Sequence, residues 1–165
     1  MSEEKEVVIF TTNFDDLENE FNDIIYEIED KSSTRFHKVK NIKFHDLNYV
    51  MTVDELLNKD SSIQEYHYDL YRKDDKGNRH LVFGFHKQSK TRDKRYRTNS
   101  DPYHIHLSKL IEFTTMDRLD NFHHEELPRI MELIRILFQF ERYLLKRIEA
   151  EIPKKRKGNG KKHNN

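Results

Sequence analysis

Two stretches in the middle of the chain, residues 80–86 and 101–107, alternate apolar and polar residues with a period of two. This is the period of a β-strand, in which successive side chains lie on opposite faces of the sheet. The apolar positions are Leu81, Phe83, Phe85, Tyr103, Ile105 and Leu107, and the polar positions include His80, His86, His104 and His106. The pattern therefore predicts two strands whose histidines share one face.

The first of these strands is predicted to form a β-hairpin with the segment before it. Residues 65–72 and 79–87 flank a polar turn in which Gly77 can adopt a positive φ angle. The polar positions of the first hairpin strand are His67, Asp69 and Tyr71. If the apolar positions face the core, these residues converge with the histidines, and Gly84 leaves room in the middle of that face.

A third strand is predicted over residues 103–108, with an extension through Ile111 and Phe113. The connections between the predicted strands are too short to hold crossover helices. We therefore expect the sheet to be antiparallel.

The N-terminal third predicts a mixture of helix and strand. Residues 7–10 suit a first strand, and Thr12 or Asn13 suits the cap of an amphipathic helix over residues 14–29. Residues 36–47 alternate less regularly and predict one or two strands. Residues 52–57 predict a helical turn capped by Thr52, with Glu55 in the capping-box position.

A long helix is predicted over residues 127–152, because its apolar residues recur at intervals of three and four. Ile136, Phe140 and Tyr143 widen the apolar stripe beyond one face. Two interpretations stay open: the N-terminal helix covers the additional surface, or another chain does. Residues 153–165 hold basic and polar residues without an apolar one, and we expect a disordered tail that resembles a nuclear import signal at its start.

These elements predict an α+β fold. We expect a small antiparallel sheet of about four or five strands, packed by an N-terminal helix and a long C-terminal helix. The length of 165 residues suits one domain, which we place at residues 1–152, followed by the tail.

Composition narrows the classes of site and partner. The chain has no cysteine, which excludes disulfides, thiolate zinc sites and cysteine nucleophiles. No apolar run is long enough to cross a bilayer, and we expect a cytoplasmic protein with no membrane partner. The formal net charge is zero, but the tail carries six basic residues, so the rest of the chain is acidic by six. Any binding of nucleic acid must therefore use a local basic patch.

The loop after His86 supplies such a patch beside the predicted histidine face. Its basic and aromatic residues are typical of surfaces that hold phosphates and stack a base of single-stranded RNA. We predict that His104, His106 and His86 act as acid–base catalysts on a phosphodiester, without a cofactor. The predicted substrate-binding residues are Lys87, Arg92, Arg95, Tyr96 and Arg97.

Three alternatives to this site stay open. The loop can be an ordinary solvated connection, and the histidines can be surface residues of the sheet. The spacing of His104 and His106 also permits metal binding, completed by His86, Glu112 or the His-His-Glu-Glu run at residues 123–126. Finally, the chain can be a non-enzymatic interaction module that forms a homodimer or binds a partner through residues 127–152.

Residues 66–70, 82–86 and 101–107 together resemble the small TumE-type toxins of prokaryotic toxin–antitoxin modules. The shared order is a tyrosine-rich strand, a turn, a strand that ends near a histidine, and a Pro-x-His-x-His segment before a C-terminal helix. The family's Arg-Tyr-Asp-Asn run is replaced here by residues 82–85. The resemblance implies a toxin that acts on RNA or translation and is neutralised by a cognate antitoxin.

Overall fold

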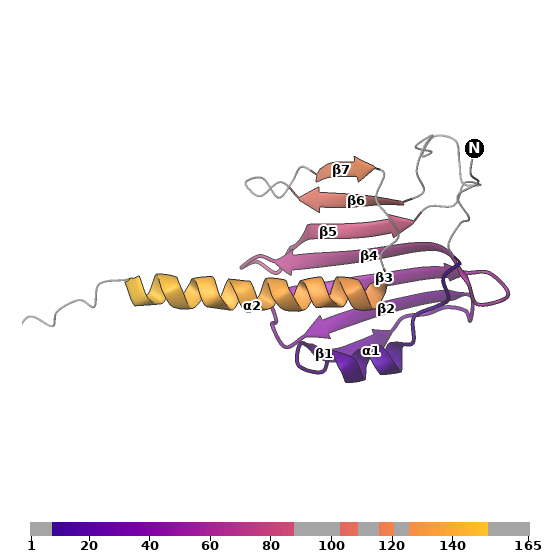
Figure 1. Ribbon diagram of the computed structural model, residues 1–165, viewed down its shortest axis with the longest axis horizontal. Helices are drawn as coiled ribbons and strands as arrows, with labels where there is room; N and C mark the ends of the chain where they lie inside the picture. Colours follow the sequence, from indigo (N-terminus) through magenta and orange to yellow (C-terminus); the bar gives the residue numbers. More distant parts are fainter. Residues whose placement is uncertain (1–7, 88–102, 109–115, 121–125, 152–165) are drawn as a thin grey trace, which may run out of the picture. The chain divides into compact units, whose positions relative to one another are not determined.

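The computed structural model describes residues 8–87, 103–108, 116–120 and 126–151. In chain order its elements are α1 (Phe14–Glu20), β1 (Ile25–Asp30), β2 (His37–Phe44), β3 (Tyr49–Leu57), β4 (Ile63–Lys73), β5 (Arg79–Lys87), β6 (Tyr103–Ser108), β7 (Met116–Asp120) and α2 (Leu127–Glu151) (Figure 1). The chain divides into two compact units, Met1–Ile130 and Met131–Asn165. This division does not test the predicted domain at residues 1–152, which stays a prediction, and the predicted tail lies outside the described residues.

The strands form one antiparallel sheet in which each strand pairs with its neighbours in sequence, from β1 to β7 (Figure 1). The predicted α+β fold, with an N-terminal helix and a long C-terminal helix, is confirmed. Side chains are described for five strands, β1 to β5, and the backbone pairing of β6 and β7 extends the sheet to seven. The strands that the sequence did not predict are β1 and β3, where it predicted helix over all or part of the segment, and β7.

The helix predicted over residues 14–29 is wrong in its second half. Asn13 caps α1, as predicted, but the helix ends at Glu20 and β1 begins at Ile25. Asn22 and Asp23 favour a turn, and the acidic residues near the helix end oppose its dipole. The isoleucines that follow are β-branched and favour the strand that pairs with β2. Spacing of three and four alone therefore overestimated the helix.

The helical turn predicted at residues 52–57 is also wrong, because this segment forms the second half of β3. Met51, Val53, Glu55 and Leu57 are buried, and the residues between them are half exposed. The alternation that matters is therefore that of a strand, and the resemblance to a capping box was a coincidence of residue types.

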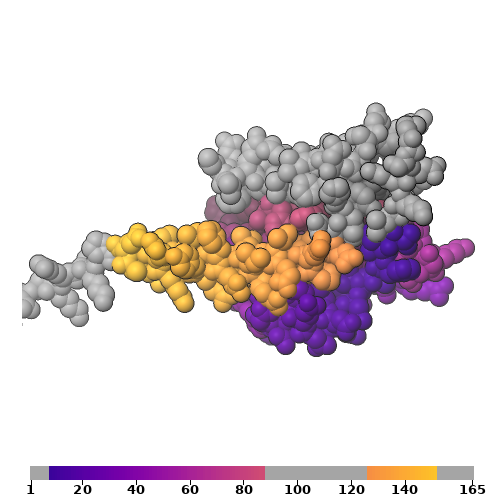
Figure 2. All heavy atoms as spheres, viewed as in Figure 1, coloured from indigo at the N-terminus to yellow at the C-terminus, as the bar shows by residue number. Residues whose placement is uncertain are grey.

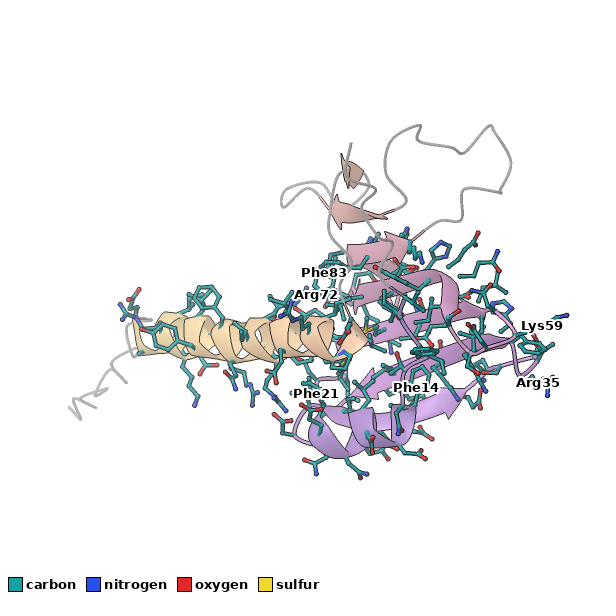
Figure 3. All side chains as sticks on the ribbon, turned by 45° about the vertical axis from the view of Figure 1, so that its right-hand side comes forward. Phe14, Phe21, Arg35, Lys59, Arg72 and Phe83 are labelled. Carbon is teal, nitrogen blue, oxygen red and sulfur yellow. The ribbon has the colours of Figure 1, made fainter. Side chains whose placement is uncertain are left out.

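The buried face of the sheet, with Phe21 at the C-cap of α1, carries the core. Its fully buried members include Phe21, Ile42, Phe44, Met51, Tyr68 and Leu70. Phe14 and Phe21, at the two ends of α1, are labelled in Figure 3. Phe14 packs under the ammonium group of Lys40 on β2, 5.1 Å from its ring centroid. The short helix thus covers the β1–β2 side of the sheet.

Glu55 is a fully buried carboxylate on this core face. One oxygen accepts hydrogen bonds from the Thr12 hydroxyl (2.5 Å) and the Tyr68 hydroxyl (2.8 Å). The other accepts from the Thr11 hydroxyl (2.7 Å) and the Thr12 amide (3.2 Å). Burial and the Glu55 carboxylate raise the pKa of the Tyr68 hydroxyl well above its usual value. The three donors of Thr11 and Thr12 attach the N-terminal segment to the sheet.

The strand predicted at residues 7–10 is wrong, because only an isolated bridge between Phe10 and Ser62 forms in the described part of that segment. The amide of Ile63 donates to the Ile9 carbonyl (2.7 Å), and the amide of Thr11 donates to the Ser61 carbonyl (2.9 Å). These contacts hold the segment beside the start of β4. The hydrogen bonds of Thr11 and Thr12 to Glu55 also attach it to β3.

The predicted hairpin is confirmed as β4 and β5. Gly77 has a φ angle of 81°, as the turn requires. The Asp74 carboxylate accepts hydrogen bonds from the backbone amides of Lys76 and Asn78 and lies 3.0 Å from Nε2 of His80. The His80 contact and the turn amides lower the pKa of Asp74. The turn is therefore fixed by one aspartate.

The predicted long helix is confirmed as α2, which at 1.5 Å per residue is about 37 Å long. Its buried positions recur at intervals of three and four: Leu127, Ile130, Met131, Ile134 and Phe138. Neither helix of the described residues is long and apolar enough to cross a membrane.

Candidate histidine face

The backbone register brings together the histidines that the sequence predicted on one face. His86 of β5 pairs with His104 of β6, and Gly84 pairs with His106. On the other side of β5, His86 pairs with His67 of β4 and Gly84 pairs with Asp69. Because directly paired residues lie on the same face of a sheet, the predicted shared face is confirmed for His86, His104 and His106. Their chemical roles stay predictions.

His80 does not belong to this face, so that part of the prediction is wrong. A register shift between Leu70 and Tyr71 leaves Val82 without a partner on β4, and beyond it Leu81 pairs with Tyr71 and His80 with Arg72. A bulge of this kind moves every later side chain to the other face. His80 instead bonds to Asp74 in the turn.

Asp69 holds the ring of His86. Nε2 of His86 lies 2.7 Å from Oδ1 of Asp69, and the two side chains are 14% and 15% exposed. Because an ionised carboxylate only accepts hydrogen bonds, the proton of the neutral His86 ring lies on Nε2, which donates a hydrogen bond to Asp69. Nδ1 is then the basic nitrogen of the neutral ring. A carboxylate that fixes the tautomer and orientation of an imidazole is the arrangement found in acid–base catalysis.

Gly84 makes this pair possible. A Cβ at this position would overlap Oδ1 of Asp69 and lie 2.9 Å from Nε2 of His86. The room that the sequence predicted above Gly84 is therefore occupied by the Asp69 carboxylate and the His86 ring. The glycine is required by a close approach of side chains rather than by its backbone conformation.

His67 lies against His86 on the side away from β6. The centroids of the two rings are 4.4 Å apart, and the ring planes are inclined by 51°. Nε2 of His67 is buried and has no hydrogen-bond partner among the described residues. Burial and the neighbouring His86 lower the pKa of His67, and the carboxylates of Asp69, Asp54 and Glu65 oppose this only in part. His67 is thus a neutral imidazole with one unsatisfied polar atom.

A second aspartate–histidine pair continues the row across the sheet. Asp54 of β3 pairs in register with His67, and its Oδ1 lies 2.8 Å from Nε2 of His37 on β2. These side chains are 43% and 39% exposed, so this pair is more solvated than that of Asp69 and His86. On the far side of the row, Asp120 and Arg118 of β7 occupy the register positions that pair with His104 and His106. The row therefore spans β2 to β7.

Lys87 is not brought to the histidine face. It pairs in register with Tyr66, whose side chain belongs to the core face, and it is buried. Its Nζ donates to the Ile63 carbonyl at 3.3 Å. The structure therefore separates Lys87 from the histidines because neighbouring residues of a strand lie on opposite faces. The other predicted substrate-binding residues, Arg92, Arg95, Tyr96 and Arg97, lie outside the described residues.

In the described ranges, no three histidine or carboxylate side chains are grouped closely enough to hold a metal ion. Glu112 and residues 123–125, which the metal alternative used, lie outside those ranges, as does the strand extension through Ile111 and Phe113. The metal alternative with His104 and His106 is therefore not tested.

Sequence reasoning placed His67 and Asp69 on the shared face but did not include them among the site residues. The signal was available, because the alternation of residues 65–72 puts both on one parity. Asp54 and His37 were missed because residues 52–57 were interpreted as helix. Arg118 was missed because β7 was not predicted.

Comparison with family models, with curated proteins and with solved structures found no match to this chain. The resemblance to TumE-type toxins therefore stays a prediction that depends on the sequence motifs alone.

Proposed function

We propose that this protein acts on RNA as the toxin of a toxin–antitoxin module, by acid–base cleavage of a phosphodiester on the histidine face. The observation that carries the proposal is the pairing of His86 with His104 in the sheet, with His86 held by Asp69 at 2.7 Å. Two imidazoles at adjacent register positions meet the need of this chemistry for one base and one acid. The described part of the proposed site is assembled by strands β4 to β6.

In this proposal His86 accepts the proton of a ribose 2′-hydroxyl at Nδ1. The 2′-oxygen then bonds to the adjacent phosphorus, the bond from phosphorus to the 5′-oxygen breaks, and His104 or His106 protonates the departing 5′-oxygen. The products are a 2′,3′-cyclic phosphate and a 5′-hydroxyl. Arg118, at the register position beside His106, offers a permanent positive charge for the phosphorane.

The basic loop after β5 is proposed to hold the rest of the substrate. Arg92, Arg95 and Arg97 supply cations for phosphates, and Tyr96 supplies a surface on which a base can stack. Lys87 has no part in this, because its side chain is buried on the core face. A cognate antitoxin is the proposed partner.

Expression in a bacterial host tests the proposal. The wild-type chain is expected to arrest growth, and His86→Ala or His106→Ala to relieve the arrest. His45→Ala is the matched control, because His45 is exposed and lies near the Asn22 carbonyl (3.1 Å) rather than in the histidine row. Purified wild-type protein is expected to cleave single-stranded RNA in the presence of a chelator and to leave 2′,3′-cyclic phosphate ends. Growth that is unaffected by the wild-type chain would refute the toxin function.

A second candidate function is self-association through α2, favoured by one specific observation. Besides its buried stripe, the helix carries a second set of large apolar residues that are at least 43% exposed. They lie on one side of the helix, and we name them the outer apolar face: Leu133, Ile136, Phe140, Tyr143, Leu144 and Ile148. In Figure 2 the atoms of α2 run from orange to yellow.

The proposed occupant of the outer apolar face is the same helix of a second copy. Half of the surface of six such side chains amounts to roughly 600 Å² per chain, so a pair buries about 1,200 Å², the lower limit of a standard stable interface. The first four of these residues follow one another at intervals of three, four and three, which is the spacing of a helix that pairs with a like helix. The two functions are compatible, since α2 is not part of the histidine row.

Light scattering after size exclusion tests the dimer. The wild-type chain is expected to have twice the monomer mass, and the double variant Ile136→Glu with Phe140→Glu to be monomeric. Gln139→Glu with Lys146→Glu is the control, because it adds negative charge to α2 outside the outer apolar face. A wild-type monomer at the highest soluble concentration would exclude self-association.

A further inference from the structure

The outer apolar face of α2 has a central seam and an apolar side. The seam consists of four exposed residues spaced by three, four and three: Leu133, Ile136, Phe140 and Tyr143. Along one side of the seam lie Leu137, which is half buried, and Leu144, which is exposed. We name these two leucines the apolar flank. They widen the surface that α2 offers to a second helix, but on one side only.

The other side of the seam is polar. It carries Glu132, Gln139 and Lys146, all of them exposed, and we name these residues the polar flank. Each flank forms a row along the helix, because residues seven apart lie on nearly the same side of an α-helix. The two flanks therefore present different surfaces to a partner that binds the seam.

The orientation of two paired helices decides which flanks meet. In a parallel pair, each flank of one helix faces the opposite flank of the other. Leu137 would then face Glu132 of the second copy, and Leu144 would face Gln139. In an antiparallel pair, each flank faces the same flank of the second copy. Leu137 then faces Leu144, and this contact is made twice because the pair is symmetric.

Only the antiparallel pair therefore buries the apolar flank against apolar side chains. In the parallel pair, burial of the same leucines would remove water from the carboxylate of Glu132 and the amide of Gln139. Removing water from a polar group is unfavourable unless a new hydrogen bond replaces it. In the antiparallel pair the two polar flanks lie together and keep their contact with solvent.

Charges do not distinguish the two orientations. An antiparallel pair brings Glu132 near Lys146 of the second copy, and a parallel pair brings Lys146 near Glu151. Exposed ion pairs of this kind contribute little. Arg129 and Arg147 continue the seam at its two ends, and each meets an arginine in either orientation. The apolar flank is the feature that decides.

We infer that α2 pairs with α2 of a second copy in antiparallel orientation. Leu133 then lies opposite Tyr143 of the second copy, and the centre of the pair is level with Phe138. Ile136 lies opposite Phe140 in the same way. The inference rests on the proposed self-association and deepens it, because it defines how the two copies meet. Since β1 to β7 precede α2 in the chain, the two sheets are attached at opposite ends of the helix pair.

Spin labels test the orientation, because the chain has no cysteine and a single introduced thiol is labelled alone. The full chain carries the label at Glu149→Cys, an exposed position outside the seam and both flanks. With a rise of about 1.5 Å per residue, the two labels of an antiparallel pair are expected about 33 Å apart along the helix axis. In a parallel pair only the interaxial distance of about 10 Å and the label linkers separate them. Electron paramagnetic resonance measures the distance.

Gln139→Cys is the matched control. This position lies near the centre of the pair, so its labels are expected within about 20 Å of each other in either orientation. Light scattering verifies that both labelled chains are dimers. Labels within about 20 Å at position 149 as well would show a parallel pair and overturn the inference, while self-association stands. Any other combination of distances in a dimer would also overturn it. Monomeric chains without coupling at either position would refute self-association, and the inference with it.

Discussion

The two faces of the sheet differ in whether their buried polar groups have hydrogen-bond partners. On the core face, Glu55 is fully buried and accepts four hydrogen bonds, from Thr11, Thr12 and Tyr68. On the histidine face, Nε2 of His67 is buried and no described residue bonds to it. Three of the four donors, from Thr11 and Thr12, belong to a segment more than 40 positions away from Glu55 in the sequence. No comparable segment reaches His67 in the described part of the chain.

This difference indicates different roles for the two faces. A buried charge with all its hydrogen bonds made stabilises one arrangement of the chain and offers nothing to a ligand. A buried polar atom without a partner lowers stability, and natural structures retain few of them. The core face is therefore structural, and the histidine face is the candidate for function. Three substitutions test this comparison.

Glu55→Leu should have the largest effect. It leaves the hydroxyls of Thr11, Thr12 and Tyr68 buried without their acceptor, and we expect the free energy of unfolding to fall by about 3–5 kcal/mol. Urea unfolding followed by circular dichroism measures the change. Glu27→Gln, at an exposed position on β1, is the control and should change stability by less than about 0.5 kcal/mol. A small effect of Glu55→Leu would show that the four hydrogen bonds contribute little.

Gly84→Ala should have an intermediate effect on stability and a large one on activity. Its Cβ overlaps Oδ1 of Asp69, so we expect a loss of about 1–3 kcal/mol and separation of Asp69 from His86. Gly77→Ala is the control, because it strains a φ angle of 81° in the turn but contacts nothing within 4 Å. The proposed cleavage of RNA should be lost in the first variant and kept in the second. Equal activity of the two would contradict the role of the Asp69–His86 pair.

His67→Leu should have the smallest effect on stability. Unlike the two substitutions above, it should raise the free energy of unfolding. Removal of an unsatisfied polar atom should raise the free energy of unfolding by up to about 1 kcal/mol near pH 7.5. The pKa of His67 in the folded chain lies below its usual value near 6.5. Below about pH 6.5 the unfolded chain therefore binds a proton that the folded chain does not, and the free energy of unfolding of the wild-type chain falls. The advantage of the leucine variant should therefore grow toward about pH 5.5. Urea unfolding at both pH values measures it, and an advantage that does not grow would contradict the neutral, buried state of His67.

Local patterns predicted the parts of the fold whose contacts are near in sequence. The hairpin of β4 and β5 follows from alternation around a turn with Gly77, and β6 and α2 follow from regular periods of two and of three to four. The prediction failed where the two periods compete. Residues 25–28 and 52–57 fit a helical spacing, but pairing with neighbouring strands satisfies their backbone groups and makes them part of β1 and β3.

The sequence by itself determined that the chain contains a strand face with His86, His104 and His106, because the alternation of apolar and polar residues assigns each to a side. Only the tertiary structure decided which residues meet on that face. Pairing brought Asp69 to His86, placed Arg118 at the position beside His106 and left His67 without a partner. The bulge at Val82 turned His80 away from the histidine face, and Lys87 lies on the core face. Strand register and bulges depend on contacts between distant segments, which no local pattern contains.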